Sequence, residues 1–493
     1  MKAKIPHDFF VFASKFTMES MIYATCYWAK EKAFDPNNST FGFASEEKYT
    51  LVHKGKTITY TTNIIQTWLI DMLYHIICKC SYGTKEISKA ESLHLINLYN
   101  GYADELDAQY LKKDKNAILY VMGFFGEQSR FQGTGVFFEE FAREKYILDT
   151  ISYRTPKEKT YDIDVMKEIA DEVNYTTDEY STLLLMIWGL LTKTSLMVNE
   201  VTLKKYLKYK NPLFSHENVL DVLSKNSITI DEIRRSGLNR QIFYAKPIIK
   251  IDDNYICSNP YLLLALFTNS NYWIMRNKYK RINSQKFTSA FGGYYETYFE
   301  EVLNNCLSSE RFTRIPEASG EKRADWHIAL GDYNLFVEQK SSLSLLGIKQ
   351  SHPDVKAMKE HMIEHWAEAI KQLNDTQKFY KKDNTIKIIL VYEEYYKSKC
   401  LDELFLLQQD LNNDNKFWLV TINELETLLY LYKTNPELAL QIISEKDAIE
   451  STKIGSDREL KQIYYKHGFD NNLYLRNCGI YEEQFDRIKN LCK

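Results

Sequence analysis

The chain has 493 residues, of which 44% are hydrophobic and 26% are charged, and its formal net charge is -3. This composition excludes a disordered chain, and at roughly 150 residues per domain the length predicts two to four domains, each with its own core. Eight cysteines without paired CxxC spacing exclude a small disulfide scaffold and show no zinc-site pattern. Reduced thiols and a cytoplasmic location are the simplest interpretation.

Residues 1–155 are predicted to form a mainly helical domain. From Asn63 to Cys80 the apolar residues recur at three-and-four spacing, which is the pattern of an amphipathic helix. No secretory signal is visible, and the longest apolar stretch, Leu183 to Leu191, is about half the length of a membrane span. We therefore expect no membrane partner.

A polar joint from Arg154 to Lys159 precedes a second segment, predicted to be helical over residues 156–286. Apolar runs on both sides of Asp252-Asp253-Asn254 predict a hairpin at 246–257. From Asn199 to Lys286 there are fifteen basic and seven acidic residues, a net charge of +8. Basic residues interleaved with aromatic ones attract a phosphate backbone, although a solvated face is the alternative. The candidate nucleic-acid contacts are Arg234, Arg235, Arg240, Arg276, Lys278, Lys280 and Arg281.

Residues 287–450 show the pattern of an α/β domain. A helix is predicted from Phe287 to Leu307, with Glu296 among its apolar residues. It is followed by predicted strands at 312–317, 324–330 and 334–340, a helix at 354–381, strands at 386–392 and 417–421, and a helix at 425–431. This order predicts a mixed sheet with helices on its faces, followed by a helical tail over 451–493.

Two carboxylates and one amine fall on a single predicted hairpin. Asp325 and Glu338 are on neighbouring strands joined by the turn Gly331-Asp332. Lys340 shares a face with Glu338 because side chains alternate along a strand. Such a group suits Mg²⁺, which takes few carboxylates and keeps water ligands. A metal there would stabilise charge on a scissile phosphate, while the lysine orients or deprotonates the nucleophile.

The pattern D-x12-E-x-K on a hairpin, after a helix that carries an acid, resembles the PD-(D/E)XK nuclease superfamily of restriction endonucleases and resolvases. The resemblance covers roughly Phe287 to Leu431 and implies a restriction endonuclease-like sheet and a Mg²⁺-dependent endonuclease, with Mn²⁺ as a substitute metal. It also implies roles for five residues. Asp325, Glu338 and the carbonyl of Gln339 would bind the metal, Lys340 would be the catalytic lysine, and Glu296 would lie near a second metal. Ala324 stands where the superfamily's proline is, and Gln339 is polar where an apolar residue is commoner.

These features together predict a nuclease that hydrolyses phosphodiester bonds, with DNA favoured over RNA. A nuclease with a bulky helical attachment resembles bacterial restriction and anti-phage effectors, in which the helical region would select the substrate or bind a partner protein. Double-strand cutters often pair two active sites, which predicts a homodimer. The competing hypothesis is a non-catalytic nucleic-acid-binding or scaffold protein on the same fold.

A second motif, His361-x-x-Glu364-His365, matches the inverted zinc-peptidase pattern, with Glu437 or Glu445 as a candidate third ligand. A zinc metallopeptidase is the less favoured hypothesis, because the motif falls within an ordinary packing stripe on the helix that the nuclease interpretation already requires. Two other patterns carry little weight. Gly55-Lys56-Thr57 lacks the upstream glycine of a phosphate-binding loop, and Glu46-Glu47-Lys48 lies in a polar stretch with no predicted strand.

Overall fold

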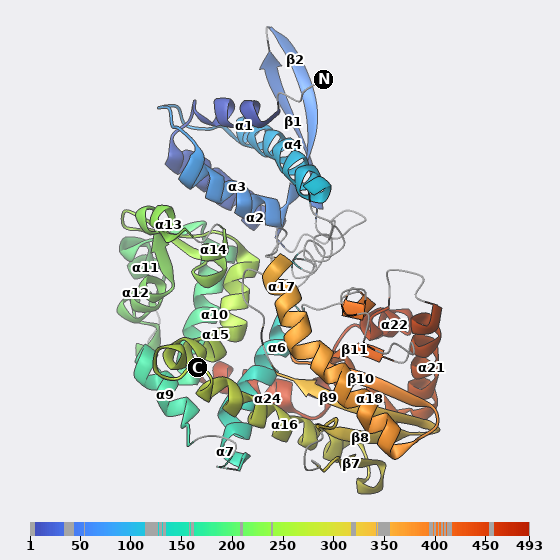
Figure 1. Ribbon diagram of the computed structural model, residues 1–493. Helices are drawn as coiled ribbons and strands as arrows, with labels where there is room; N and C mark the ends of the chain where they lie inside the picture. Colours follow the sequence, from blue (N-terminus) through green and yellow to red (C-terminus); the bar gives the residue numbers. More distant parts are fainter. Residues whose placement is uncertain are drawn as a thin grey trace. The chain divides into compact units, whose positions relative to one another are not determined.

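The computed structural model describes residues 5–33, 44–53, 55–113, 127, 131, 135–156, 158, 162–207, 211–237, 240–316, 322–341, 343, 355–393, 398, 401–402, 404–405, 408, 411, 417–452 and 458–492 (Figure 1). The chain divides into two compact units. Unit 1 comprises Met1–Phe137, Asp178–Ser270 and Ile488–Lys493, and unit 2 comprises Phe138–Thr177 and Asn271–Arg487. Each unit is built from segments that are separate in the sequence, whereas the domains predicted from sequence are consecutive segments.

The described residues of the first part of unit 1 form four helices and a two-stranded antiparallel ribbon. These elements are α1 (Ile5–Ala13), α2 (Met18–Lys32), β1 (Ala44–His53), β2 (Lys56–Ile65), α3 (Gln66–Lys79) and α4 (Lys89–Lys113). Helix α3 confirms the predicted amphipathic helix. The ribbon corrects one interpretation, because Glu46-Glu47-Lys48 lies on β1. Gly55, with φ of 79°, forms the turn before β2, so Gly55-Lys56-Thr57 lies at a hairpin turn and leads into a strand.

The second part of unit 1 is mainly helical and contains a small sheet. Its helices are α10 (Thr177–Gly189), η2 (Leu190–Thr194), α11 (Glu200–Tyr206), η3 (Pro212–Phe214), α12 (His216–Lys225), α13 (Ile230–Ser236), α14 (Gln241–Ala245) and the start of α15 (Pro260–Ile282). Its strands, β3 (Met197–Val198), β4 (Ser227–Thr229), β5 (Ile248–Ile251) and β6 (Asn254–Cys257), are ordered β3-β6-β5-β4. Strands β5 and β6 confirm the predicted hairpin, and Asp252 turns the chain with φ of 51°.

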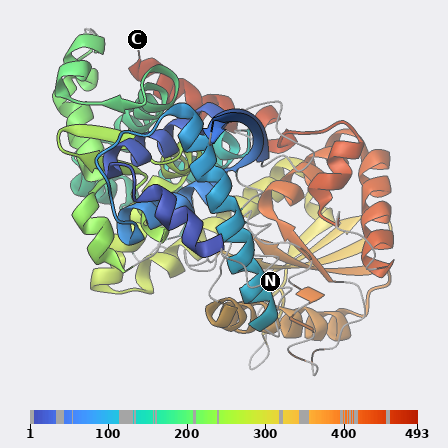
Figure 2. The same ribbon diagram turned by 90° about the horizontal axis from the view of Figure 1, so that it is seen from above.

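Unit 2 is an α/β unit built on a five-stranded mixed sheet of order β11-β10-β9-β8-β7 (Figure 2). Strands β7 (Phe312–Arg314), β8 (Trp326–Leu330) and β9 (Tyr333–Lys340) are antiparallel, whereas β10 (Thr385–Val391) and β11 (Phe417–Thr421) continue the sheet in parallel from β9. Every residue of β10 and β11 is buried, as expected for strands covered on both faces. The mixed sheet predicted from sequence is confirmed, together with the helix-strand order.

Helices surround this sheet. They are α6 (Gly135–Tyr146), η1 (Ile147–Ile151), α7 (Ser152–Arg154), α9 (Val165–Val173), α16 (Lys286–Cys306), η4 (Ser309–Arg311), α17 (Val355–His361), η5 (Met362–Ala367), α18 (Glu368–Tyr380), α20 (Ile422–Thr434), α21 (Pro436–Thr452), α22 (Leu460–Lys466), α23 (Leu473–Asn477) and α24 (Ile480–Leu491). Trp326 of β8 contacts Phe299 of α16, whereas the next residue, His327, stacks on Tyr380 of α18. Helices α16 and α18 therefore cover opposite faces of the antiparallel strands.

None of the described helices is both long enough and apolar enough to cross a lipid bilayer.

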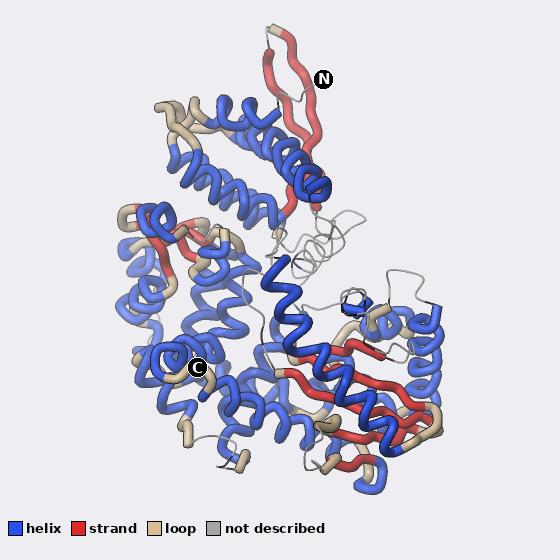
Figure 3. The backbone as a smooth tube through the Cα atoms, in the orientation of Figure 1, coloured by secondary structure: helices blue, strands red, loops and turns tan. Residues whose placement is uncertain are grey.

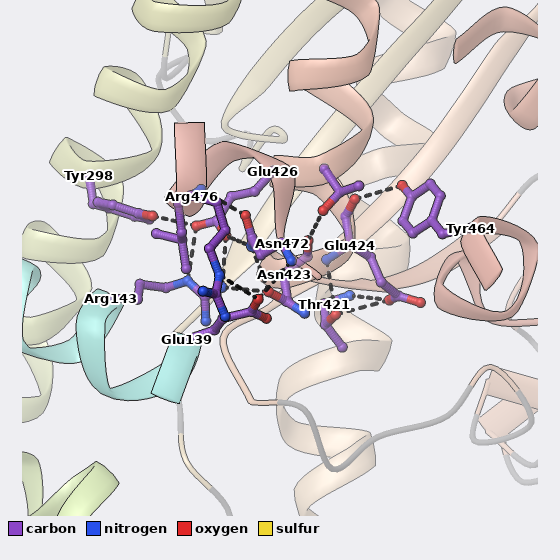
Figure 4. A network of polar contacts seen from close by, with 12 residues as sticks. Glu139, Arg143, Tyr298, Thr421, Asn423, Glu424, Glu426, Tyr464, Asn472 and Arg476 are labelled. Carbon is purple, nitrogen blue, oxygen red and sulfur yellow. Dashed lines mark hydrogen bonds and ion pairs between the residues drawn. The ribbon is translucent and has the colours of Figure 1, made fainter. Parts of the chain in front are cut away.

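A buried charge network joins the helices of unit 2 (Figure 4). Arg143 of α6 donates hydrogen bonds to both oxygens of Glu426 on α20, at 2.9 and 2.7 Å. The two side chains are 1% and 0% exposed. Glu426 also accepts hydrogen bonds from Tyr298 of α16 and from Asn472, the residue before α23. Because a buried charge is costly unless it is paired, this network fixes four helices in one arrangement.

We expect Arg143→Met to lower the stability of unit 2 by about 3–5 kcal/mol, because it leaves the Glu426 carboxylate buried without its cation. Thermal unfolding followed by calorimetry measures the loss as a lower Tm. The control is Lys167→Ala, which removes the exposed ion pair between Lys167 and Asp171 and should leave the Tm unchanged. Equal Tm changes for the two variants would contradict a structural role for the buried pair.

Candidate active site

The predicted acidic pair lies at the adjoining ends of β8 and β9. Asp325 immediately precedes β8, and its Oδ2 accepts a hydrogen bond of 2.7 Å from the backbone N–H of Gln339. Trp326 pairs with Val337 in the antiparallel register, so Asp325 lies opposite Glu338. Trp326 and Gln339 point to the α16 face, where Trp326 Nε1 donates to Gln339 Oε1 at 2.7 Å. By alternation, Asp325 and Glu338 point to the other face.

Lys340 completes the group on the same face. Its Nζ lies 2.7 Å from Glu338 Oε1, and its side chain is 19% exposed. The second oxygen of Glu338, Oε2, is buried and has no hydrogen-bond partner among the described residues. An unpartnered buried carboxylate oxygen is rare in proteins because its desolvation is not repaid. One ligand position on Glu338 is therefore open.

The electrostatics of the pair are dominated by burial. Burial raises the pKa of Asp325 to about 6, against the hydrogen bond from the Gln339 backbone. Burial, followed by repulsion from Asp325, raises the pKa of Glu338 to about 8, against the attraction of Lys340. Two acids removed from water and close to each other create a place where additional positive charge is stabilising.

Glu296 lies on the α16 face. Its Oε2 accepts a hydrogen bond of 2.6 Å from Arg314 Nη2, and the Arg314 guanidinium also lies over the ring of Trp326. Glu296 is still close enough to Asp325 to contribute to raising its pKa. The sequence analysis missed Arg314, although its place on a short strand beside the predicted hairpin was a usable signal. The role of Glu296 beside a second metal stays a prediction.

Helix α18 and the turn before it line the face that carries Glu338. Glu368 binds Lys322 at 2.5 Å, and the hydrogen bond from Lys322 lowers the pKa of Glu368. Burial lowers the pKa of His365, and the positive charge of Lys340 lowers it further. Gln372 Oε1, on the same helix, is buried without a hydrogen-bond partner among the described residues. Glu368 was not singled out from the sequence, although it follows Glu364 and His365 at helical spacing.

Whether these residues fit a divalent cation depends on their donor atoms. Among the described residues, no group of three or more His, Cys, Asp and Glu side chains is placed to hold a metal ion. Two carboxylates, a backbone carbonyl at Gln339 and water are nevertheless the hard oxygen set that Mg²⁺ takes, since Mg²⁺ keeps several of its waters. The open Oε2 of Glu338 fits this set.

The seven basic residues proposed as nucleic-acid contacts differ in accessibility. Arg240 does not fit that role, because it is buried and donates to Glu127 Oε2 at 2.7 Å and to the Thr67 carbonyl at 3.2 Å. Arg234 and Arg235 are both exposed, and each donates to a backbone carbonyl, Arg234 to that of Ile77 and Arg235 to that of Asp231. These three residues belong to unit 1.

The other four basic residues belong to unit 2 and lie on α15. Arg276 donates to the hydroxyl of Tyr272 at 2.8 Å. Lys278 and Arg281 are paired with acids of α9, which neutralise part of their charge. Lys280 is exposed. The contact of these residues with nucleic acid stays a prediction.

The histidine motif lies where α17 becomes the π-helix η5. The rings of His361 and His365 are 4.5 Å apart between centroids. Of the two candidate third ligands, Glu445 is bonded to His467 at 3.1 Å. Among the described residues, no acid joins the two histidines in a metal-binding group.

Comparison with known proteins finds no matching family model, no matching curated sequence and no matching solved structure.

We expect Glu338→Gln to raise the Tm of the protein in EDTA by about 2–4 °C at pH 9, above the raised pKa of Glu338, because there a neutral amide removes a buried charge that repels Asp325. Millimolar Mg²⁺ should raise the Tm of the wild type but not that of the variant, since only the wild type keeps the ligand set. Differential scanning fluorimetry measures both effects, with the exposed Glu300→Gln as control. A lower Tm for Glu338→Gln in EDTA would show that the carboxylate is stabilising without a metal.

Proposed function

We propose that unit 2 is a metal-dependent nuclease of the PD-(D/E)XK type that hydrolyses phosphodiester bonds of nucleic acid. The observation that supports it is the gathering of Asp325, Glu338 and Lys340 on one face of β8 and β9, with one oxygen of Glu338 open. A role in restriction or anti-phage defence, and a homodimer, are predictions that follow from the same proposal.

Asp325, Glu338 and the Gln339 carbonyl would hold Mg²⁺, or Mn²⁺ in its place. When bound, such a cation stabilises negative charge on the scissile phosphate and lowers the pKa of a bound water. Lys340 is held at Glu338 by its 2.7 Å hydrogen bond, so its ammonium can orient the attacking water from a fixed position. In the net reaction a water oxygen bonds to phosphorus, and the leaving oxygen departs with a proton.

Arg314 is a further cation beside this group. Glu296 holds its guanidinium by one hydrogen bond, and half of the side chain remains exposed. A guanidinium presents a fork of donors that matches two phosphate oxygens. In this proposal Glu296 positions Arg314, and Arg314 binds a phosphate of the substrate.

We expect Asp325→Asn and Lys340→Ala each to reduce cleavage by at least about 100-fold, because each removes a group that acts on the reacting phosphate. EDTA should abolish the cleavage by the wild type, and Mg²⁺ or Mn²⁺ should restore it. The measurement is gel-resolved cleavage of plasmid DNA, single-stranded DNA and RNA.

The matched control is Glu364→Gln, which alters the histidine motif and leaves the hairpin intact. It should cleave like the wild type. If the wild type and all variants are equally inactive on every substrate, the nuclease proposal fails and the competing hypothesis, a non-catalytic nucleic-acid-binding or scaffold protein, takes its place.

A further inference from the structure

The ribbon formed by β1 and β2 extends beyond the core that supports it. Near its base, Tyr49 is buried against the ring of His94 on α4, and Asn100 of α4 donates to the Asn63 carbonyl at 2.7 Å. Beyond Tyr49 the support ends, and Val52 is 74% exposed. Figure 3 shows the ribbon, in red, reaching past the helices of the same part of unit 1. A two-stranded ribbon is at best marginally stable by itself, so an unsupported extension calls for a functional reason.

One face of the ribbon is a regular array of short hydroxyl side chains. Across the two strands, Lys48 pairs with Thr61, Thr50 with Thr59 and Val52 with Thr57, and all six are exposed. The hydroxyls of Thr50 and Thr59 lie 3.4 Å apart. Threonine carries both a hydroxyl that hydrogen-bonds base edges and a methyl that contacts thymine.

The extended part of the ribbon, from Lys48 to Thr62, carries positive charge only. From Lys48 to Thr62 the sequence contains three lysines and one histidine but no aspartate or glutamate. Lys48 and Lys56 are exposed, whereas Lys54 lies outside the described residues. Two acids lie at the base: Glu47 is paired with Lys32 of α2, and Glu46 is exposed on the face that carries Lys48. The extended part of the ribbon therefore presents positive charge to a partner, as phosphate recognition requires.

The dimensions of the ribbon favour double-stranded DNA over double-stranded RNA as its partner. The strand advances by four residue steps from Tyr49 to His53, which corresponds to about 14 Å at roughly 3.4 Å per residue. The major groove of B-form DNA is about 12 Å wide and 8.5 Å deep and admits a two-stranded ribbon. The major groove of A-form RNA is too narrow and deep for side chains to read.

We propose that the β1–β2 ribbon binds double-stranded DNA by inserting its threonine face into the major groove, with Lys48 and Lys56 contacting the flanking phosphates. This inference takes from the proposed function only that the partner is a nucleic acid. It specifies that nucleic acid as duplex DNA. It concerns binding, so it can be tested without cleavage.

The test is fluorescence anisotropy of the full chain with a 24-base-pair DNA duplex and with an RNA duplex of the same sequence, both in EDTA. We expect Lys48→Gln/Lys56→Gln to weaken DNA binding at least tenfold and to reduce the slope of log affinity against log salt by about 2, since each phosphate contact contributes about 0.9. Thr50→Val/Thr59→Val keeps the shape of the strands and should weaken DNA binding without changing the slope. The control, Lys167→Gln/Lys466→Gln, removes two exposed lysines from helices of unit 2 and should change neither.

Unchanged DNA affinity in both ribbon variants would overturn the inference, as would an equal loss of affinity for the RNA duplex. Ribbon variants that keep their DNA affinity but sediment as monomers, when the wild type sediments as a dimer, would assign the ribbon to contact between copies and also overturn it. Circular dichroism and Tm values matching the wild type establish that the variants are folded. If ribbon-dependent binding is found in a protein that never cleaves, the nuclease proposal fails and this inference stands.

Discussion

The arrangement of unit 2 depends on one buried ion pair, Arg143 with Glu426. Its two side chains are removed from water, so any movement that separates them leaves a charge without a partner. The same glutamate binds Tyr298 of α16, which fixes that helix against the sheet. Helix α16 in turn supplies Glu296 and the Tyr295 carbonyl, which accepts a hydrogen bond from Gln339. The ion pair thus helps to fix the helix that contacts the strands of the candidate site from their other face.

The candidate site itself is stabilised less well than its surroundings. Asp325 and Glu338 are brought together by the pairing of two strands, although burial and mutual repulsion both oppose their charged forms. Backbone hydrogen bonds of the sheet offset this cost and keep the two acids in register. Such local strain is typical of sites whose final partner is a ligand. A rigid sheet is what allows it to persist.

Much of unit 2 could be predicted from the sequence because its strands are apolar and its helices periodic. The hairpin with Asp325 and Glu338 was found because a tight turn at Gly331 separates two alternating runs, and the structure confirms that turn. The β1–β2 ribbon was missed because its outward residues are threonine and lysine, which give no apolar alternation. The burial of Arg240 was missed for a different reason. Its partners, Asp71 and Glu127, are more than a hundred residues away in the chain, and charge counting treats every arginine as exposed.

The π-helical turn between α17 and α18 has a consequence for how this chain can change. A π-helical turn holds one residue more than an α-helical turn. Removing one residue between Met362 and Ala367 would convert this turn into an α-helical one and leave the flanking helices in the same rotational phase. Removing one residue between Glu368 and Gln372 instead would rotate the part before the deletion by about 100° relative to Thr376, whose hydroxyl oxygen accepts a hydrogen bond from the Ala324 backbone. The π-helical turn is therefore the place where this helix can lose a residue without a rotation of its two halves.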